Sequence, residues 1–119
     1  MPNLDLHIKK YKHNKDFSNI LLKDEYCDWQ ITAAFYAALH LVEAVLSKEN
    51  IHPTSHEERE NVMLDNYKIF NNDAMNNYHV LRNLSHKARY TDIIENNEEL
   101  YLAKESLSNI EEEIKKYID

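Results

Sequence analysis

The chain has 119 residues, a formal net charge of −7, no glycine, two prolines and one cysteine. This length corresponds to one domain, so we expect residues 1–119 to form a single unit. The lack of glycine argues against Walker-type and Rossmann-type nucleotide enzymes, because their phosphate-binding loops need backbone with positive φ. The single cysteine, Cys27, excludes an internal disulfide framework and a cysteine-based zinc cluster, and it is typical of a reducing compartment.

The first residues carry Asp5 and Lys9 where a signal peptide needs an apolar stretch. The longest stretch without a formal charge, residues 29–42, is too short to cross a bilayer. We therefore expect a cytoplasmic protein that does not contact a membrane.

Hydrophobic periodicity predicts helices, because no segment sustains the period of two that a half-buried strand shows. The first helix should span about residues 4–23 and is irregular, with Leu4, Ile8 and Tyr11 on one stripe. The second should span residues 28–48. It is apolar on nearly all sides between Ala33 and Val42, which predicts a central helix covered by the others.

Three further helices are predicted after Pro53. Ser55 followed by Glu58 is a capping-box pattern for a third helix that runs to about residue 70, with Val62, Met63 and Phe70 facing inward. A fourth helix is expected at residues 73–90 and a fifth at residues 97–118. The fifth carries an apolar stripe at near-heptad spacing, formed by Leu100, Ala103, Leu107, Ile110, Ile114 and Tyr117. The sequence therefore predicts an all-α fold.

A polar seam crosses the second helix. At 100° per residue, Trp29, Thr32, Tyr36, His40 and Glu43 fall within an arc of about 80°. One interpretation is that Tyr36 and His40 are core residues with satisfied polar atoms, while Glu43 is solvated. The other is that the seam forms the wall of a cleft.

A second polar cluster, His52, His56 and Arg59, surrounds the predicted start of the third helix. Three interpretations are open. The first is surface histidines with a bond between Arg59 and a carboxylate of another helix, and the second is a metal site with His40 as third ligand. The third is an anion site, because a helix start, His56 and Arg59 together favour a phosphate.

The fourth predicted helix carries a basic strip. Met75, His79, Arg82, His86 and Arg89 follow at steps of four, three, four and three residues, which places them on one face. Between residues 79 and 90 there are three cations, two histidines and no acid, so the local charge opposes that of the chain. Such a strip is either a solvated helix face or a patch that docks RNA or a nucleotide. The adjacent face is expected to be core, with Ala74, Tyr78, Leu81 and Ala88.

Three segments carry a family resemblance: residues 28–40 with Phe35-Tyr36-Ala37-Ala38-Leu39-His40, residues 52–59, and Tyr78 through Leu81, Ser85 and Ala88-Arg89-Tyr90. Together they resemble the HEPN superfamily, small prokaryotic helical bundles of toxin–antitoxin and defence modules and partners of nucleotidyltransferases. The resemblance implies an antiparallel bundle of four or five helices, usually dimeric, with a cleft between protomers. It also implies an antitoxin or a nucleotidyltransferase as the partner protein.

In active members of that superfamily, an Arg followed by a polar residue, with a His farther along, forms a metal-independent RNase site. Arg82-Asn83 and His86 match this pattern, although the gap is one residue short of the family spacing. The resemblance implies that His86 is the acid/base, that Arg82 stabilises the phosphate, and that Ser85, Arg89 and Tyr90 support the site. A second cluster for binding would contain Tyr36, His40, His56 and Arg59.

We therefore predict a cytoplasmic homodimer that binds RNA or a nucleotide. If the protein is an enzyme, the expected activity is that of a metal-independent endoribonuclease. This prediction needs no metal and no cofactor. Two alternatives stay open. One is a metal-dependent helical-bundle hydrolase that uses His40, His52 and His56, and the other is a noncatalytic module that binds a partner protein.

Overall fold

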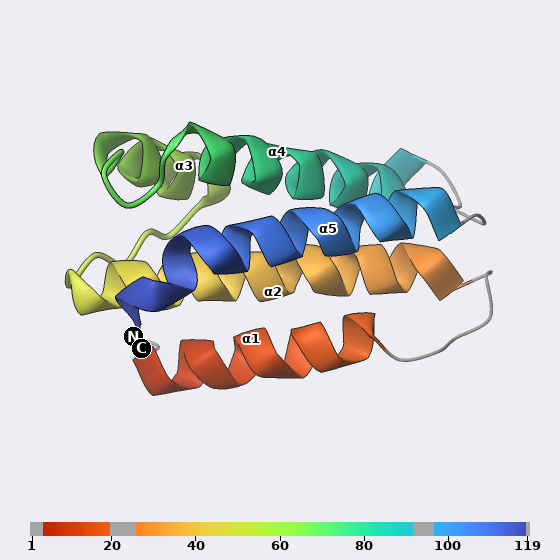
Figure 1. The fold of residues 1–119 in the computed structure, drawn as a ribbon, viewed down its shortest axis with the longest axis horizontal. Coiled ribbons are helices and arrows are strands. Elements are labelled where there is room, and N and C mark those ends of the chain that lie inside the picture. Colours follow the sequence, from red (N-terminus) through yellow and green to blue (C-terminus); the bar gives the residue numbers. More distant parts are fainter. Residues whose placement is uncertain (1–3, 20–25, 92–96, 119) are drawn as a thin grey trace.

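The computed structural model describes residues 4–19, 26–91 and 97–118. Helices make up 85% of the described residues, which contain no strand, and this confirms the predicted all-α fold. The elements are α1 (Leu4–Ser18), α2 (Cys27–Lys48), α3 (His56–Asp65), α4 (Asn72–His86), a π-helical turn η2 (Lys87–Thr91), α5 (Asn97–Ile114) and a 3-10 turn η3 (Lys115–Tyr117). The long helices α1, α2, α4 and α5 run antiparallel in chain order, with α2 between α1 and α4 (Figure 1).

The helix α2 forms the centre of the core, as its apolar composition predicts. It contacts α1, α4 and α5, and 14 of its 22 residues are buried. By length and composition α2 would be able to cross a membrane, but 78% of its most apolar window is buried inside the bundle. In this structure the other helices cover the apolar surface of α2.

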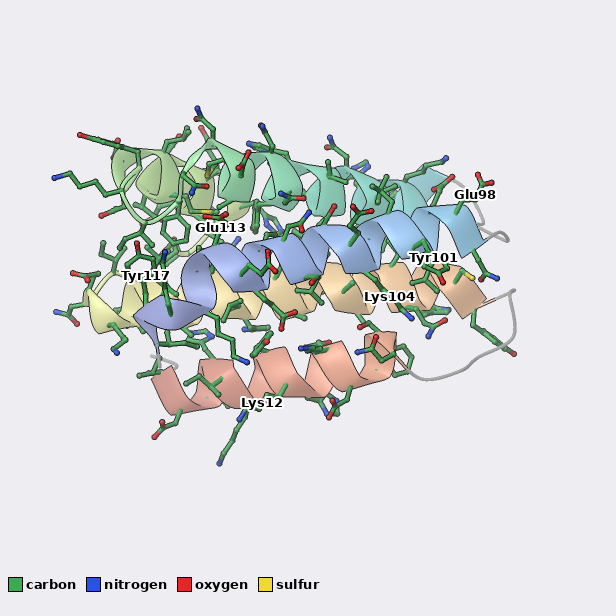
Figure 2. The ribbon with its side chains drawn as sticks, viewed as in Figure 1. Lys12, Glu98, Tyr101, Lys104, Glu113 and Tyr117 are labelled. Carbon is green, nitrogen blue, oxygen red and sulfur yellow. The ribbon has the colours of Figure 1, made fainter. Side chains whose placement is uncertain are left out.

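Polar contacts fix α1 against the bundle. The hydroxyl of Tyr11 donates to the carboxylate of Glu111 on α5, and Lys15 Nζ lies 2.7 Å from the same carboxylate. Gln30 of α2 donates to the carbonyl oxygen of Ser18 at 3.2 Å. The basic side of α1 thereby pairs with the acidic C-terminal helix, while Lys12 points away from the bundle (Figure 2).

Three predicted helices end earlier than expected. The first ends at Ser18, and residues 20–23 of its predicted range lie outside the described residues. The third ends at Asp65, because Asn66 leaves the helical conformation at φ −104° and ψ 51°, and the side chain of Asn66 donates to the carbonyl of Val62 at 2.7 Å. Phe70 nevertheless lies in the core, at 1% exposed, as predicted. The fifth gives way to the 3-10 turn after Ile114.

The apolar stripes of α4 and α5 are confirmed as core. Ala74, Tyr78, Leu81 and Ala88 are buried, and so are Leu100, Ala103, Leu107, Ile110 and Ile114. Tyr117 is the exception on the α5 stripe, at 36% exposed. Met75, predicted on the basic face, is also buried. The α-helical geometry of α4 ends at His86, and the wider turn η2 carries the chain from there to Thr91.

Candidate functional site

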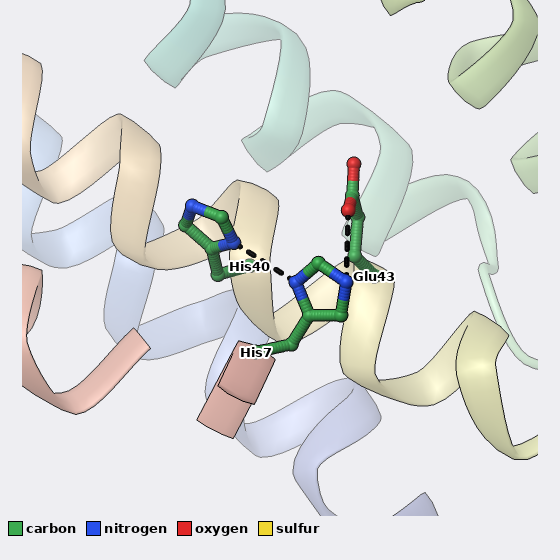
Figure 3. Close-up of side chains that lie close together, drawn as sticks. All are labelled: His7, His40 and Glu43. Atoms are coloured by element: carbon green, nitrogen blue, oxygen red, sulfur yellow. Dashed lines mark hydrogen bonds and ion pairs between the residues drawn. The ribbon is translucent and has the colours of Figure 1, made fainter. Parts of the chain in front are cut away.

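The polar seam of α2 is part of a chain of polar contacts inside the bundle. His40 Nδ1 lies 3.1 Å from His7 Nδ1, and His7 Nε2 lies 3.3 Å from Glu43 Oε2 (Figure 3). The other carboxylate oxygen of Glu43 accepts from Arg59 Nε at 2.9 Å and from Arg59 Nη2 at 2.5 Å. Arg59 Nη1 lies 3.0 Å from His56 Nδ1. The contacts therefore run from His40 through His7, Glu43 and Arg59 to His56.

Burial decides which side chains in this series of contacts are charged. His7 is 4% exposed and Arg59 is 7% exposed. Burial lowers the pKa of His7, and burial together with the neighbouring His7 lowers the pKa of His40 to about 4. At neutral pH both rings are therefore uncharged, and one ring nitrogen donates to the other. The ion pair between Arg59 and Glu43 remains as the charged centre of the group.

The positive charges of all three arginines of the chain act on one histidine, His56. The three arginines are Arg59 on α3, Arg82 on α4 and Arg89 on η2. Burial lowers the pKa of His56, and the positive charges of all three arginines lower it further. Arginine binds carboxylate and phosphate groups better than lysine does, because its planar guanidinium presents several fixed donors. The cluster therefore has the chemistry of an anion site.

Phe35 is fully buried and lies between Arg89 and His56. Its ring centroid lies 5.4 Å from that of Tyr36, 6.0 Å from that of His56 and 5.7 Å from that of Tyr78. The guanidinium carbon of Arg89 lies 5.9 Å from the same ring centroid and 5.4 Å from that of Tyr36. These contacts hold side chains from α2, α3, α4 and η2 around one buried ring.

Arg89 is held by neutral groups. Its Nη1 donates to the hydroxyl of Tyr36 at 2.7 Å, and its Nε donates to the carbonyl oxygen of Ser85 at 3.3 Å. The side-chain oxygens of Ser85 and Tyr78 are buried nearby and have no hydrogen-bond partner among the described residues. Burial raises the pKa of Tyr78 to about 12, against the lowering effect of Arg59, so its hydroxyl stays protonated.

A groove of about 240 Å³ opens on the outer side of Arg89. Trp29 and Tyr90 line it and are 60% and 68% exposed. Asp28 and Thr32 line the same groove and offer polar atoms. The guanidinium carbon of Arg89 lies 5.1 Å from the Tyr90 ring centroid. Exposed aromatic rings beside a cation form the kind of surface on which nucleobases stack.

The predicted catalytic pair does not form a contact within the chain. Arg82 forms an ion pair with Glu60, whose other carboxylate oxygen lies 3.1 Å from Nδ1 of His79. His86 is exposed, and its ring centroid lies 5.0 Å from that of Tyr90. Arg89 lies in the π-helical turn and donates to Tyr36 of α2, whereas Arg82 pairs with Glu60 of α3.

The structure joins some of the predicted binding residues and separates others. Tyr36 contacts Arg89, His56 contacts Arg59, and His86 contacts Tyr90. The predicted bond between Arg59 and a carboxylate of another helix is confirmed by Glu43, so the expectation of a solvated Glu43 is wrong. His40, His52 and His56 are not assembled as a metal site. In the described part of the chain, the metal-ligand group within 4.8 Å consists of His7, His40 and Glu43.

Two residues of these contacts were missed by sequence reasoning. His7 lies three residues after Leu4 and four before Tyr11, and this spacing places it on the buried side of the first helix. Glu60 has no comparable signal, because its partners Arg82 and His79 lie on another helix.

No protein-family model matches the chain, and a search of the curated proteins finds no relative.

Proposed function

We propose that this protein binds a nucleotide or a single strand of RNA, with a phosphate at the arginine cluster and a base in the groove beside Arg89. The observation that carries the proposal is the position of Arg89, which the Tyr36 hydroxyl and the Ser85 carbonyl oxygen hold beside a groove lined by Trp29 and Tyr90. A phosphate is a ligand that the remaining guanidinium donors fit well.

Arg89 is the primary phosphate ligand of the proposal. A guanidinium has five N–H donors, and two of those of Arg89 are bound to Tyr36 and Ser85. The side chain of Arg82 is 41% exposed and lies near enough to act on His56. A bound phosphate would therefore meet charge from α4 and from η2.

The groove supplies contacts for a base and a ribose. Trp29 and Tyr90 offer exposed rings, and stacking on an aromatic side chain contributes about 1–3 kcal/mol per base. The carboxylate of Asp28 accepts hydrogen bonds from amino or hydroxyl groups, and Thr32 lies beside it in the lining. Both kinds of contact favour a nucleotide over inorganic phosphate alone.

Cleavage of bound RNA is the second candidate function. It accompanies the HEPN membership and the homodimer that the resemblance implies, and the cytoplasmic location that the sequence predicts. It is favoured by the positions of Arg82 and His86 one helical turn apart on α4, with His86 exposed. His86 would move the proton of the ribose 2′-hydroxyl, and Arg82 would stabilise the phosphate. Glu60 holds Arg82 in the single chain, so cleavage requires Arg82 to exchange this partner for substrate.

Fluorescence anisotropy with a short labelled RNA, in excess EDTA, tests binding. We expect Trp29→Ala and Tyr90→Ala each to weaken binding at least fivefold, through the loss of about 1 kcal/mol or more of stacking. Arg89→Met should weaken it at least tenfold and lower the slope of log affinity against log salt by about 0.7, the value for one phosphate contact to a single strand. The matched controls are Tyr101→Ala, which removes a ring that is 76% exposed on α5, and Lys12→Met on α1.

Absence of binding by the wild type to RNA and to free nucleotides at micromolar concentration would refute the proposal, as would equal losses in the control variants. The same RNA samples, separated on a gel, test cleavage. Activity that is lost in both His86→Ala and Arg82→Ala supports the RNase. Binding without cleavage leaves the noncatalytic module.

A further inference from the structure

We propose that His7 and Glu43 bind a divalent transition-metal ion such as Zn²⁺ at a cavity between α1, α2 and the start of α3, with His40 as a positioning residue. This site is separate from the groove at Arg89 and does not depend on the proposed function.

The two ligand atoms already have the spacing that a metal ion needs. His7 Nε2 lies 3.3 Å from Glu43 Oε2 (Figure 3). In tetrahedral coordination with bonds of about 2.0–2.1 Å, neighbouring ligand atoms lie about 3.3 Å apart. Imidazole nitrogen and carboxylate oxygen are a donor pair that suits zinc and the neighbouring transition metals. The ion therefore needs little movement of either side chain.

A cavity of about 180 Å³ lies next to these atoms, and both His7 and Glu43 line it. This volume holds an ion and water, since one water occupies about 30 Å³. Ser47 lines the same cavity, and its hydroxyl oxygen is buried without a hydrogen-bond partner among the described residues. His52 and Thr54 complete the polar part of the lining. A metal-bound water would give the Ser47 hydroxyl a partner, and His52 provides a further imidazole.

His40 fixes the ring of His7. The Nδ1 atoms of the two rings lie 3.1 Å apart. When His7 Nδ1 carries the hydrogen and donates it to His40, the lone pair of His7 lies on Nε2, the nitrogen that faces Glu43. An imidazole that ligates a metal commonly donates its second N–H to a carboxylate, a backbone carbonyl or water. In this chain the Nδ1 atom of His40 takes the place of that acceptor. Arg59 occupies the other oxygen of Glu43 and leaves Oε2 for the ion.

Titration of the full chain, produced without a histidine tag and stripped with EDTA, tests the site. We expect Zn²⁺ to bind at a ratio of one per chain in calorimetry, and Co²⁺ to give a visible absorption band. His7→Ala and Glu43→Gln should each weaken Zn²⁺ binding at least tenfold. His13→Ala removes an exposed histidine of the same helix and should leave binding unchanged.

Three further variants separate a metal site from a structural role. Ser47→Leu fills the cavity and keeps both ligands, and it should also weaken binding tenfold. His40→Phe keeps a ring but removes the nitrogen that accepts the hydrogen of His7 Nδ1, so it should shift the position of the Co²⁺ absorption band. His40→Asn supplies an acceptor again and should return the band to its wild-type position. Circular dichroism confirms that each variant is folded.

Failure of the wild type to bind Zn²⁺ or Co²⁺ at up to 1 mM, about the weakest affinity of a specific site, would overturn this proposal. Unchanged Zn²⁺ affinity in folded His7→Ala would do the same. RNA binding is measured in EDTA, so these outcomes are distinguishable from a failure of the proposed function.

Discussion

Replacement of Arg59 by methionine tests the contribution of the buried ion pair to stability. Arg59 is 7% exposed, the side chain of Glu43 is 13% exposed, and two N–H groups of Arg59 donate to one oxygen of Glu43. Removal of one partner of a buried pair costs about 3–5 kcal/mol, because the other charge stays buried. Methionine has a similar length and restores about 1 kcal/mol of apolar contact. We therefore expect the free energy of unfolding to fall by about 3 kcal/mol.

Urea unfolding followed by circular dichroism at 222 nm, at pH 7 in EDTA, measures this change. The double variant Arg59→Met with Glu43→Gln removes the stranded charge, so we expect it to be more stable than Arg59→Met alone. Lys87→Met is the control, since the side chains of Lys87 and Glu99 are 45% and 26% exposed and their ion pair should contribute less than about 1 kcal/mol. A loss below 1 kcal/mol in Arg59→Met, or a double variant less stable than the single one, would contradict the reasoning about burial.

Three further predictions follow from burial and charge. The lowered pKa of His56 means that the unfolded chain takes up a proton before the folded chain does. Stability should therefore fall as the pH drops below 6.5, and urea midpoints at several pH values should show a shallower fall in His56→Gln. The thiol of Cys27 is 1% exposed, so a thiol reagent should modify it only on unfolding, and fast reaction of the native protein would contradict this burial. Light scattering at micromolar concentration should give twice the chain mass of 14.2 kDa, and a monomer would remove the proposed homodimer.

The sequence predicted best where helices carry a long periodic pattern. In α2 and α5 the apolar positions repeat over several turns, so their burial depends little on any single neighbour. The end of α3 was missed because it depends on the backbone conformation of a single residue, Asn66, which no periodic pattern encodes. The π-helical turn after His86 was missed for a related reason, since a periodic pattern assumes the same rotation at every residue.

The sequence indicated which residues form the candidate site, but it did not indicate which of them contact one another. Tyr36, His56, Arg59 and Arg89 all lie in the arginine cluster or contact it. Their partners were hidden because they lie on other helices. His7 lies 33 positions from His40, for example. Spacing along one helix indicates which residues share a face, but it does not indicate which face of a neighbour lies opposite.

The charge balance of the cluster distinguishes Arg89 from the other two arginines. Glu43 neutralises Arg59, and Glu60 neutralises Arg82. The contacts of Arg89 in the described part of the chain are with neutral oxygens and aromatic rings. Asp28 lines the same groove but, among the residues that the structure describes, forms no ion pair with Arg89. An anion can therefore reach Arg89 without displacing a carboxylate, whereas contact with either other arginine requires it to compete with one. For this reason Arg89→Met should weaken RNA binding more than Arg82→Met does, and the reverse order would place the phosphate on α4.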